Sequence, residues 1–142
     1  IRDEVQREIL EPARKDGKDM SQLKRVTELM TPENISELEY FASCFQESLR
    51  IDPPVFYSSF IKMSDDITAG GLKIKKGDLL TIGMGHTSHN PNEFHTPSEF
   101  IPERFDPKSH YYKRPDGGRR NPYSSSPFLG GMRVCLGQTF II

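Results

Sequence analysis

The most informative part of the sequence reads FLGGMRVCLG and occupies residues 128–137. It places one thiol, Cys135, in a short segment between Gly131 and Gly137. Glycine allows positive φ angles and lets the backbone approach a flat ligand closely. Gly137 stands where a helix is expected to begin, and amides near a helix N-terminus favour the thiolate over the thiol. The pattern therefore predicts a thiolate that serves as an axial ligand of a metal.

Two neighbouring side chains fit the same prediction. Arg133 precedes Cys135 by two residues, stays cationic in a dry site and can bind a carboxylate with both arms of its guanidinium. Phe128 would form an apolar wall that limits the access of water. The alternative is that Cys135 is a small buried apolar residue between two turns, which is the ordinary case for an isolated cysteine. Five fixed residue types within ten positions favour the metal-ligand interpretation.

The five positions match FxxGxRxCxG, and the segment resembles the haem-binding loop of the cytochrome P-450 (CYP) superfamily. Two further motifs of that family lie upstream in the same order. Glu47 and Arg50 match ExxR, and residues 100–105 match FxPxRF with Arg104 as its arginine. Alone, a Glu–Arg pair spaced three apart on a helix is usually an exposed ion pair of little energetic value. The three motifs together identify the chain as a member of this superfamily.

The resemblance implies a cofactor and a role for each motif residue. Haem b would bind with its iron on the sulfur of Cys135, and Arg133 would pair with a haem propionate. Glu47, Arg50 and Arg104 would form a buried structural network that fixes the loop leading to the cysteine. The other positions of the haem-binding motif are Phe128, Gly131 and Gly137.

The resemblance also implies a reaction, the insertion of one oxygen atom from O2 into a small, lipophilic organic substrate. NADPH would supply the electrons through a reductase. The acid and the alcohol that the family places over the distal haem face have no counterpart in this sequence, so we expect no catalytic side chain within it and no activity from it alone. Two alternatives stay open: a haem-thiolate enzyme that isomerises or dehydrates peroxides, and a non-enzymatic remnant of such a gene.

The resemblance and the local patterns predict a mainly α fold with a small antiparallel β-sheet, the C-terminal part of the cytochrome P-450 fold. The expected parts of this single partial domain are a helical region at 1–50, a small sheet at 51–90, a meander and loop at 91–127, and the haem-thiolate loop with the start of a helix at 128–142. His86 and His89 lie near the family's second propionate region, but histidines at turns are more often structural. Residues 55–60 would overlie the haem edge and could touch substrate, and they lack the basic propionate partner that the family often carries there.

Helix signals divide the first fifty residues. Pro12 and Gly17 break the first helical pattern, and Ser21 is a candidate cap for a short helix through Leu29. Thr31-Pro32 predicts the start of the ExxR helix, with threonine as the cap and proline in the first turn. The apolar stripe expected to face the core consists of Ile35, Leu38, Phe41, Ala42, Phe45 and Leu49.

The net charge and the local charge pattern limit the classes of partner that we expect. Nineteen Lys and Arg against twenty Asp and Glu leave a net charge of −1, so we expect no nucleic-acid partner. One loop is locally basic, and we predict that it docks the acidic flavin domain of the reductase; the alternative is that its charges only keep a loop soluble. Its cations, opposed by Asp116 alone, are Lys108, Lys113, Arg114, Arg119, Arg120 and Arg133, the last reserved for a propionate.

The ends of the chain bear on its location. It opens in mid-helix and closes on an apolar run without a stop signal, which we interpret as a piece of a longer protein. No apolar run approaches the ~20 residues of a membrane-spanning helix. Eukaryotic members of the family usually face the cytoplasm from the endoplasmic reticulum membrane, held by an N-terminal anchor. We expect that location if the source is eukaryotic, with any anchor in a preceding segment.

Overall fold

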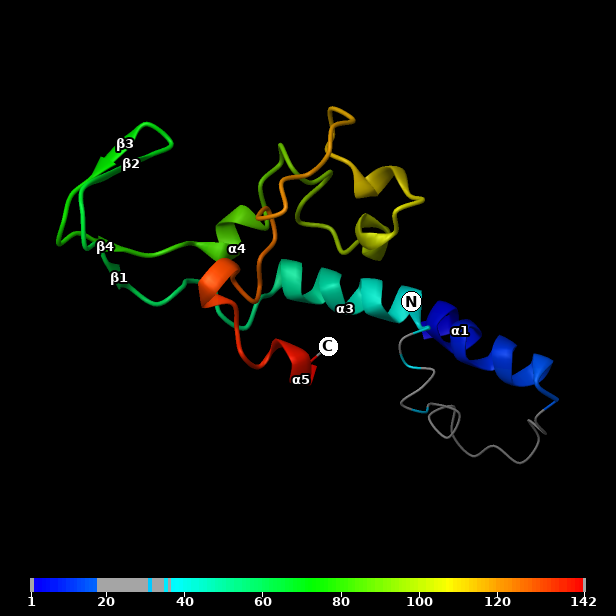
Figure 1. Cartoon of the computed structure of the whole chain (residues 1–142). Coiled ribbons are helices and arrows are strands. Elements are labelled where there is room, and N and C mark those ends of the chain that lie inside the picture. Colours follow the sequence, from blue (N-terminus) through cyan, green and yellow to red (C-terminus); the bar gives the residue numbers. More distant parts are fainter. Residues whose placement is uncertain (1, 18–30, 32–34, 36, 142) are drawn as a thin grey trace.

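The computed structural model describes residues 2–17, 31, 35 and 37–141 (Figure 1). Helices dominate, and two small antiparallel sheets lie at one end of the molecule, which confirms the predicted fold class. The longer helices are α1 (Arg2–Lys15) and α3 (Glu39–Ile51), and the shorter ones are α4 (Met84–Thr87) and α5 (Gln138–Ile141). Single 3-10 turns form η3 (Pro102–Phe105), η4 (His110–Tyr112) and η5 (Gly131–Arg133).

Helix α1 continues past the proline that was expected to end it. Pro12 lies inside the helix, and its carbonyl accepts the amide of Asp16 at 3.0 Å. Proline lacks an amide donor and crowds the carbonyl four residues before it, but its own carbonyl still accepts, so the last turn forms. Gly17 follows with φ +73°, a conformation that suits glycine after a helix end. The short helix predicted for Ser21–Leu29 falls outside the described residues.

Helix α3 begins at Glu39, later than Thr31-Pro32 predicted. The carbonyl of Thr31 accepts the amide of Ile35 at 3.1 Å, but Leu38 has ψ 70° and interrupts any helical path into α3. Leucine offers no side-chain acceptor for the first amides of the helix. Glu8 of α1 supplies one, because its carboxylate accepts the amides of Tyr40 at 2.5 Å and Phe41 at 3.1 Å.

The face of α3 that the chain buries is the polar one. Its buried residues are Ser43, Cys44, Glu47 and Arg50. Of the predicted apolar stripe only Leu38 is buried, and it joins Ile9 and Ala13 of α1 in a small core. Phe41 is 44% exposed. The expectation that the stripe faces the core of this chain was therefore wrong, because Glu47 and Arg50 have partners in the segment that packs on α3.

Two hairpin-like pairs make up the sheets. Strands β1 (Ile61–Lys62) and β4 (Leu79–Leu80) pair antiparallel, as do β2 (Ile67–Ala69) and β3 (Leu72–Ile74). Gly70 and Gly71 join β2 to β3 with φ angles of +55° and +81°, which L-residues with a side chain rarely adopt. The strand-like residues before β1 are irregular instead. There the amide of Ser58 donates to Ile82, and its hydroxyl accepts the amide of Ile82 in place of a ladder carbonyl.

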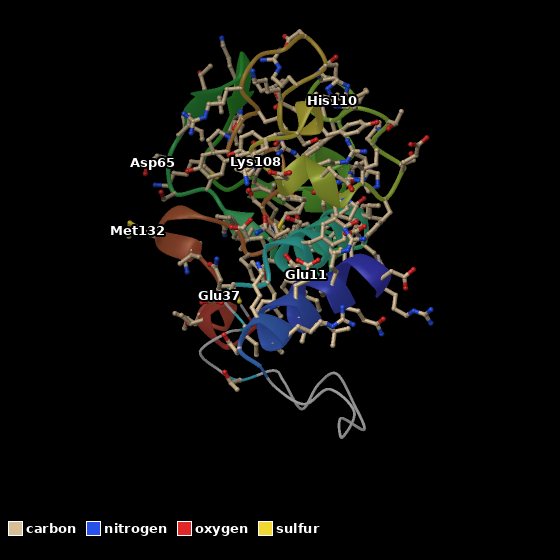
Figure 2. The ribbon with its side chains drawn as sticks, turned by 90° about the vertical axis from the view of Figure 1, so that its right-hand side faces the viewer. Glu11, Glu37, Asp65, Lys108, His110 and Met132 are labelled. Carbon is tan, nitrogen blue, oxygen red and sulfur yellow. The ribbon has the colours of Figure 1, made fainter. Side chains whose placement is uncertain are left out.

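Residues 88–127 form turns and 3-10 helices that lie along α3 (Figure 1). Helix α3 packs against η3, and η3 packs against η4. Figure 2 views the molecule from the side, with Lys108 and His110 in this irregular layer above the helices and Met132 projecting from the edge. Within the described ranges, no helix is both long enough and apolar enough to cross a membrane.

Glu8→Ala should destabilise the complete protein by about 1 kcal/mol, the usual value of a helix N-cap, because the amides of Tyr40 and Phe41 lose their acceptor. Chemical denaturation monitored by circular dichroism measures the change. Glu11→Ala on the exposed side of the same helix is the matched control. Equal shifts for the two variants would contradict a capping role for Glu8.

Candidate functional site

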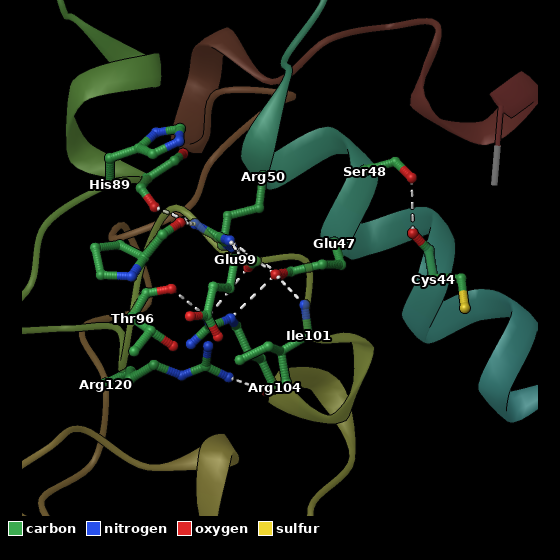
Figure 3. A network of polar contacts seen from close by, with 12 residues as sticks. Cys44, Glu47, Ser48, Arg50, His89, Thr96, Glu99, Ile101, Arg104 and Arg120 are labelled. Carbon is green, nitrogen blue, oxygen red and sulfur yellow. Dashed lines mark hydrogen bonds and ion pairs between the residues drawn. The ribbon is translucent and has the colours of Figure 1, made fainter. Parts of the chain in front are cut away.

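The centre of the irregular layer is a buried ionic network of three side chains (Figure 3). Glu47, Arg50 and Arg104 are all 0% exposed. Arg50 binds Glu47 through two parallel contacts, from Nε to Oε2 and from Nη2 to Oε1, each at 2.7 Å. Arg104 donates from Nε to Oε1 of the same carboxylate at 3.0 Å. The structure thus brings together the two motifs that are more than fifty positions apart in sequence.

Backbone groups of the irregular layer extend the network, although Nη1 of Arg104 has no hydrogen-bond partner among the described residues. The amide of Ile101 donates to Oε1 of Glu47 at 2.9 Å. Arg50 donates from Nη1 to the carbonyls of Ser88 and Pro97, both at 2.8 Å. Both arginines also reach the carbonyl of Glu99, at 3.2 and 3.3 Å. Since the acceptors span residues 88–99, the network ties a segment without regular structure to a single turn of α3.

The charges of the network do not cancel, because two guanidiniums face one carboxylate. Burial lowers the pKa of Arg104, and the hydrogen bond that it donates to Glu47 opposes that shift. An arginine nevertheless stays protonated in a protein. The ring of Phe94, only 2% exposed, lies 5.1 Å from the guanidinium of Arg50 and adds a cation–π contact. Phe94 belongs to no motif, so no sequence pattern indicates this contact.

The second part of the candidate site is the cysteine loop. Its two ends are joined because the amide of Cys135 donates to the carbonyl of Phe128 at 2.9 Å. Leu129 and Gly131 both have φ +61°, whereas Gly137 has no positive φ. Turns flank the cysteine on both sides, as expected, but only the one at Gly131 uses a positive φ at glycine; residues 136–137 turn without one. A side chain at residue 137 would have its Cβ 3.6 Å from the sulfur of Cys135, an ordinary contact distance.

The two cysteines differ in environment. Cys135 is an exposed free thiol two residues before Gly137, which precedes helix α5. Cys44 is buried in α3, and burial raises the pKa of its thiol. A thiol with a raised pKa is a poorer source of thiolate, the form that binds metals. Cys135 is therefore the better candidate ligand.

A cavity of about 840 Å³ lies between the β1 region and the cysteine loop. Its size is within the usual range for small-molecule and cofactor sites. Arg133 and Gly131 line it from the loop, and Lys62 lines it from β1. Apolar residues that also line it are Phe60, Ile61, Ile82, Met84 and Leu129. Phe128 is half-buried and, with Cys135, is not among the lining residues, so the apolar wall comes from other side chains.

The donor set fits one side of a haem. An exposed thiol, two cations and a mixed apolar lining match the needs of a flat apolar group with an iron centre and two carboxylates. Met132 and Leu136, next to Arg133 and Cys135, are almost fully exposed apolar side chains. Such a set of exposed apolar residues is typical of a surface that another group covers.

His86 and His89 have structural partners. The ring of His86 packs against Phe56 at 5.3 Å and Tyr57 at 5.7 Å between centroids. A ring nitrogen of His89 lies 2.9 Å from the carbonyl of Gly85. Neither histidine lines the cavity. A Cβ at Gly85 would come 2.2 Å from the Phe56 ring, so any other residue there would displace this ring.

The cations of the basic loop differ in exposure and in their partners. Lys108, Lys113 and Arg119 are exposed. Arg114 pairs with Asp116 at 2.6 Å. Arg120 is half-buried among aromatic rings, and burial lowers its pKa. The expectation that Arg120 belongs to an exposed docking surface was therefore wrong.

Comparison with known proteins shows the family to which the chain is similar. The family model described as cytochrome P-450 matches residues 1–140. Cytochrome P-450 4F6 of Rattus norvegicus is 33% identical over 108 residues, which are 76% of this chain and 19% of the relative. Cytochrome P-450 4V2 of Mus musculus is 35% identical over 115 residues, 80% of this chain and 20% of the relative.

A solved structure shows the same fold. It is described as retinoic acid bound cyanobacterial CYP120A1, with a TM-score of 0.71 and 26% sequence identity. The match covers 98% of this chain and 28% of that one. The chain thus spans about a fifth of the length of the curated relatives that it matches.

Glu47→Ala should cost roughly 3–5 kcal/mol, because it leaves two buried guanidiniums without their carboxylate. In the complete protein we expect loss of folded, haem-loaded material rather than slower turnover. Yield, haem content and thermal unfolding measure this loss. Glu37→Ala, at an exposed residue, is the control. Normal haem content and stability in Glu47→Ala would reduce the network to a dispensable ion pair.

Proposed function

Because the chain belongs to the cytochrome P-450 family, we propose that it forms the haem-thiolate part of a monooxygenase. The observation that carries the proposal is the exposed thiol of Cys135 in a closed loop beside a cavity that Arg133 lines. The substrate would be a small, lipophilic organic molecule, and O2 would supply the inserted oxygen atom. NADPH would supply the electrons through a reductase.

Cys135 would bind the iron of haem b as its axial ligand. Arg133 would pair with one propionate through its guanidinium. Lys62 lines the same cavity and offers a second cation, which matters because residues 55–60 contain none. Gly131 adopts the positive φ that the loop needs, while Phe128 accepts the amide of Cys135 and holds the loop closed. When bound, the haem supplies the oxygen-activating iron, and thiolate ligation favours cleavage of the O–O bond.

The other residues of the chain would act by positioning. Glu47, Arg50 and Arg104 would hold the irregular layer against α3 and so keep the approach to the cysteine loop in place. Val55, Tyr57 and Phe60 are exposed apolar or aromatic side chains before β1, and they would contact a lipophilic substrate. We assign no proton-transfer role to a side chain of this chain, and we expect no activity from the chain alone.

The family also supports a location and a partner. Membership is consistent with the cytoplasmic face of the endoplasmic reticulum membrane, where eukaryotic members meet an NADPH-dependent reductase. Lys108, Lys113 and Arg119 would form the docking surface for its acidic flavin domain. Charge complementarity of this kind raises the association rate more than the affinity.

Cys135→Ser should abolish the thiolate-type spectrum of the reduced carbon monoxide complex in the complete protein, because a neutral hydroxyl replaces the sulfur ligand. Cys44→Ser is the matched control, since Cys44 is a buried thiol within α3, and it should leave the spectrum in place. The reverse outcome would overturn the assignment of the ligand.

Substrate oxidation that requires NADPH and reductase, rather than an added organic peroxide alone, distinguishes a monooxygenase from a peroxide-rearranging enzyme.

Reversing the exposed cations Lys113 and Arg119 to Glu should slow the first electron transfer from the reductase, because the approach of an acidic domain loses its attraction. The effect should be largest at low salt and fade as the screening length falls to about 10 Å near 0.1 M ionic strength. Stopped-flow reduction at several salt concentrations measures it. Lys75→Glu, beyond β3 at the sheet end of the molecule, is the control. Unchanged rates in the double variant would place the docking surface elsewhere.

A further inference from the structure

The adjacent arginines of the basic loop occupy different environments. Arg119 is exposed, whereas the guanidinium of Arg120 lies among three aromatic rings. Its distances to the ring centroids are 5.1 Å for Phe94, 5.5 Å for Phe105 and 5.4 Å for Tyr112. All three are within the range in which a cation is attracted to the face of a ring. An arginine that only kept the loop soluble would not need such surroundings.

Arg120 contacts the buried network at two points. Its Nη2 donates to the backbone carbonyl of Arg104, as the dashed line in Figure 3 shows. It also shares the ring of Phe94 with Arg50, since both guanidiniums lie 5.1 Å from the same centroid. Phe94 is 2% exposed, so the ring that the two guanidiniums share is itself shielded from water. The arginine is therefore linked to Arg104 through the backbone and to Arg50 through a ring.

Arg120 connects the buried network to the chain segment that precedes the cysteine loop. It stands at the start of the segment that leads to Phe128 and Cys135. The next residue is also anchored, because the backbone amide of Asn121 donates a hydrogen bond to the carboxylate of Glu93 at 2.8 Å. At the far end, the amide of Cys135 is held by the carbonyl of Phe128 at 2.9 Å. The backbone segment that ends at the Cys135 thiol is thus anchored to the network at its start, by Arg120.

We propose that Arg120 is a positioning residue for the Cys135 thiolate, tying the start of the cysteine loop to the Glu47–Arg50–Arg104 network. The inference rests on the proposed function, because it takes Cys135 as the iron ligand. A guanidinium suits this position better than an ammonium, since its plane stacks on rings while its edge donates a hydrogen bond. Arg120 is then unavailable for docking a partner, and Arg119 remains exposed.

The test compares matched substitutions at the two adjacent positions of the complete, haem-loaded protein. The variants are Arg120→Ala, Arg120→Lys, Arg119→Ala and Arg119→Lys. The readout is the rate at which the reduced carbon monoxide complex loses its thiolate-type spectrum under mild heating, at equal haem content. We expect Arg120→Ala to lose it about tenfold faster, a factor that corresponds to roughly 1.4 kcal/mol. Arg120→Lys should be intermediate, and both Arg119 variants should match the parent.

A second readout separates positioning from docking. The salt dependence of reduction by the reductase should change in Arg119→Ala and stay unchanged in Arg120→Lys, because only Arg119 is exposed. If Arg120→Ala yields too little folded protein, Arg120→Lys against Arg119→Lys decides the matter, since both retain the charge. Equal rates of spectral loss in that pair would overturn the inference.

Cys135→Ser, measured alongside, distinguishes a failure of the proposed function from a failure of the positioning role of Arg120. If Cys135→Ser retains the thiolate-type spectrum, the proposed function fails and the inference fails with it. If Cys135→Ser abolishes the spectrum while the Arg120 and Arg119 variants behave alike, only the positioning role of Arg120 is lost.

Discussion

The carboxylate of Glu47, buried with two guanidiniums on it, is the interaction on which the rest of the structure depends. Burying one such group alone would be prohibitively costly, so each must find its partners from the folded chain. The partners are Arg50 one turn along α3, Arg104 from η3, and carbonyls and an amide of residues 88–101. A layer with almost no regular structure is held in place because it supplies those partners.

This constraint also explains the orientation of α3. A helix normally buries its apolar stripe, but here Glu47 and Arg50 face the irregular layer while Phe41 stays largely exposed. Leaving a buried charge unpaired costs more free energy than leaving an aromatic ring exposed, so the pairing of Glu47 and Arg50 decides which face is buried. In the family fold to which the chain is similar, much more protein is present than this chain contains, and an apolar face of α3 is suited to packing against it.

Positive charge accumulates around the network and is compensated without a second carboxylate. Arg50 and Arg104 pair with the one carboxylate of Glu47, and Arg120 shares the ring of Phe94 with Arg50. Backbone carbonyls accept many of the remaining donors. Aromatic faces and oriented carbonyls thus stabilise the arginines, and through Arg120 the same arrangement reaches the segment that carries the candidate haem ligand.

The family and the fold class could be predicted from the sequence, because they depend on residue types at fixed spacings within short segments, and the same spacings nominated Cys135 as the candidate haem ligand. The sequence also nominated Glu47, Arg50 and Arg104, although only through the resemblance, since their helical phase pointed away from the expected core. Tertiary structure decided the buried face of α3, the cap that Glu8 provides, and the difference between Arg119 and Arg120. Each of these depends on contacts between residues distant in sequence, and no local pattern records which side chain meets which ring, carbonyl or helix end.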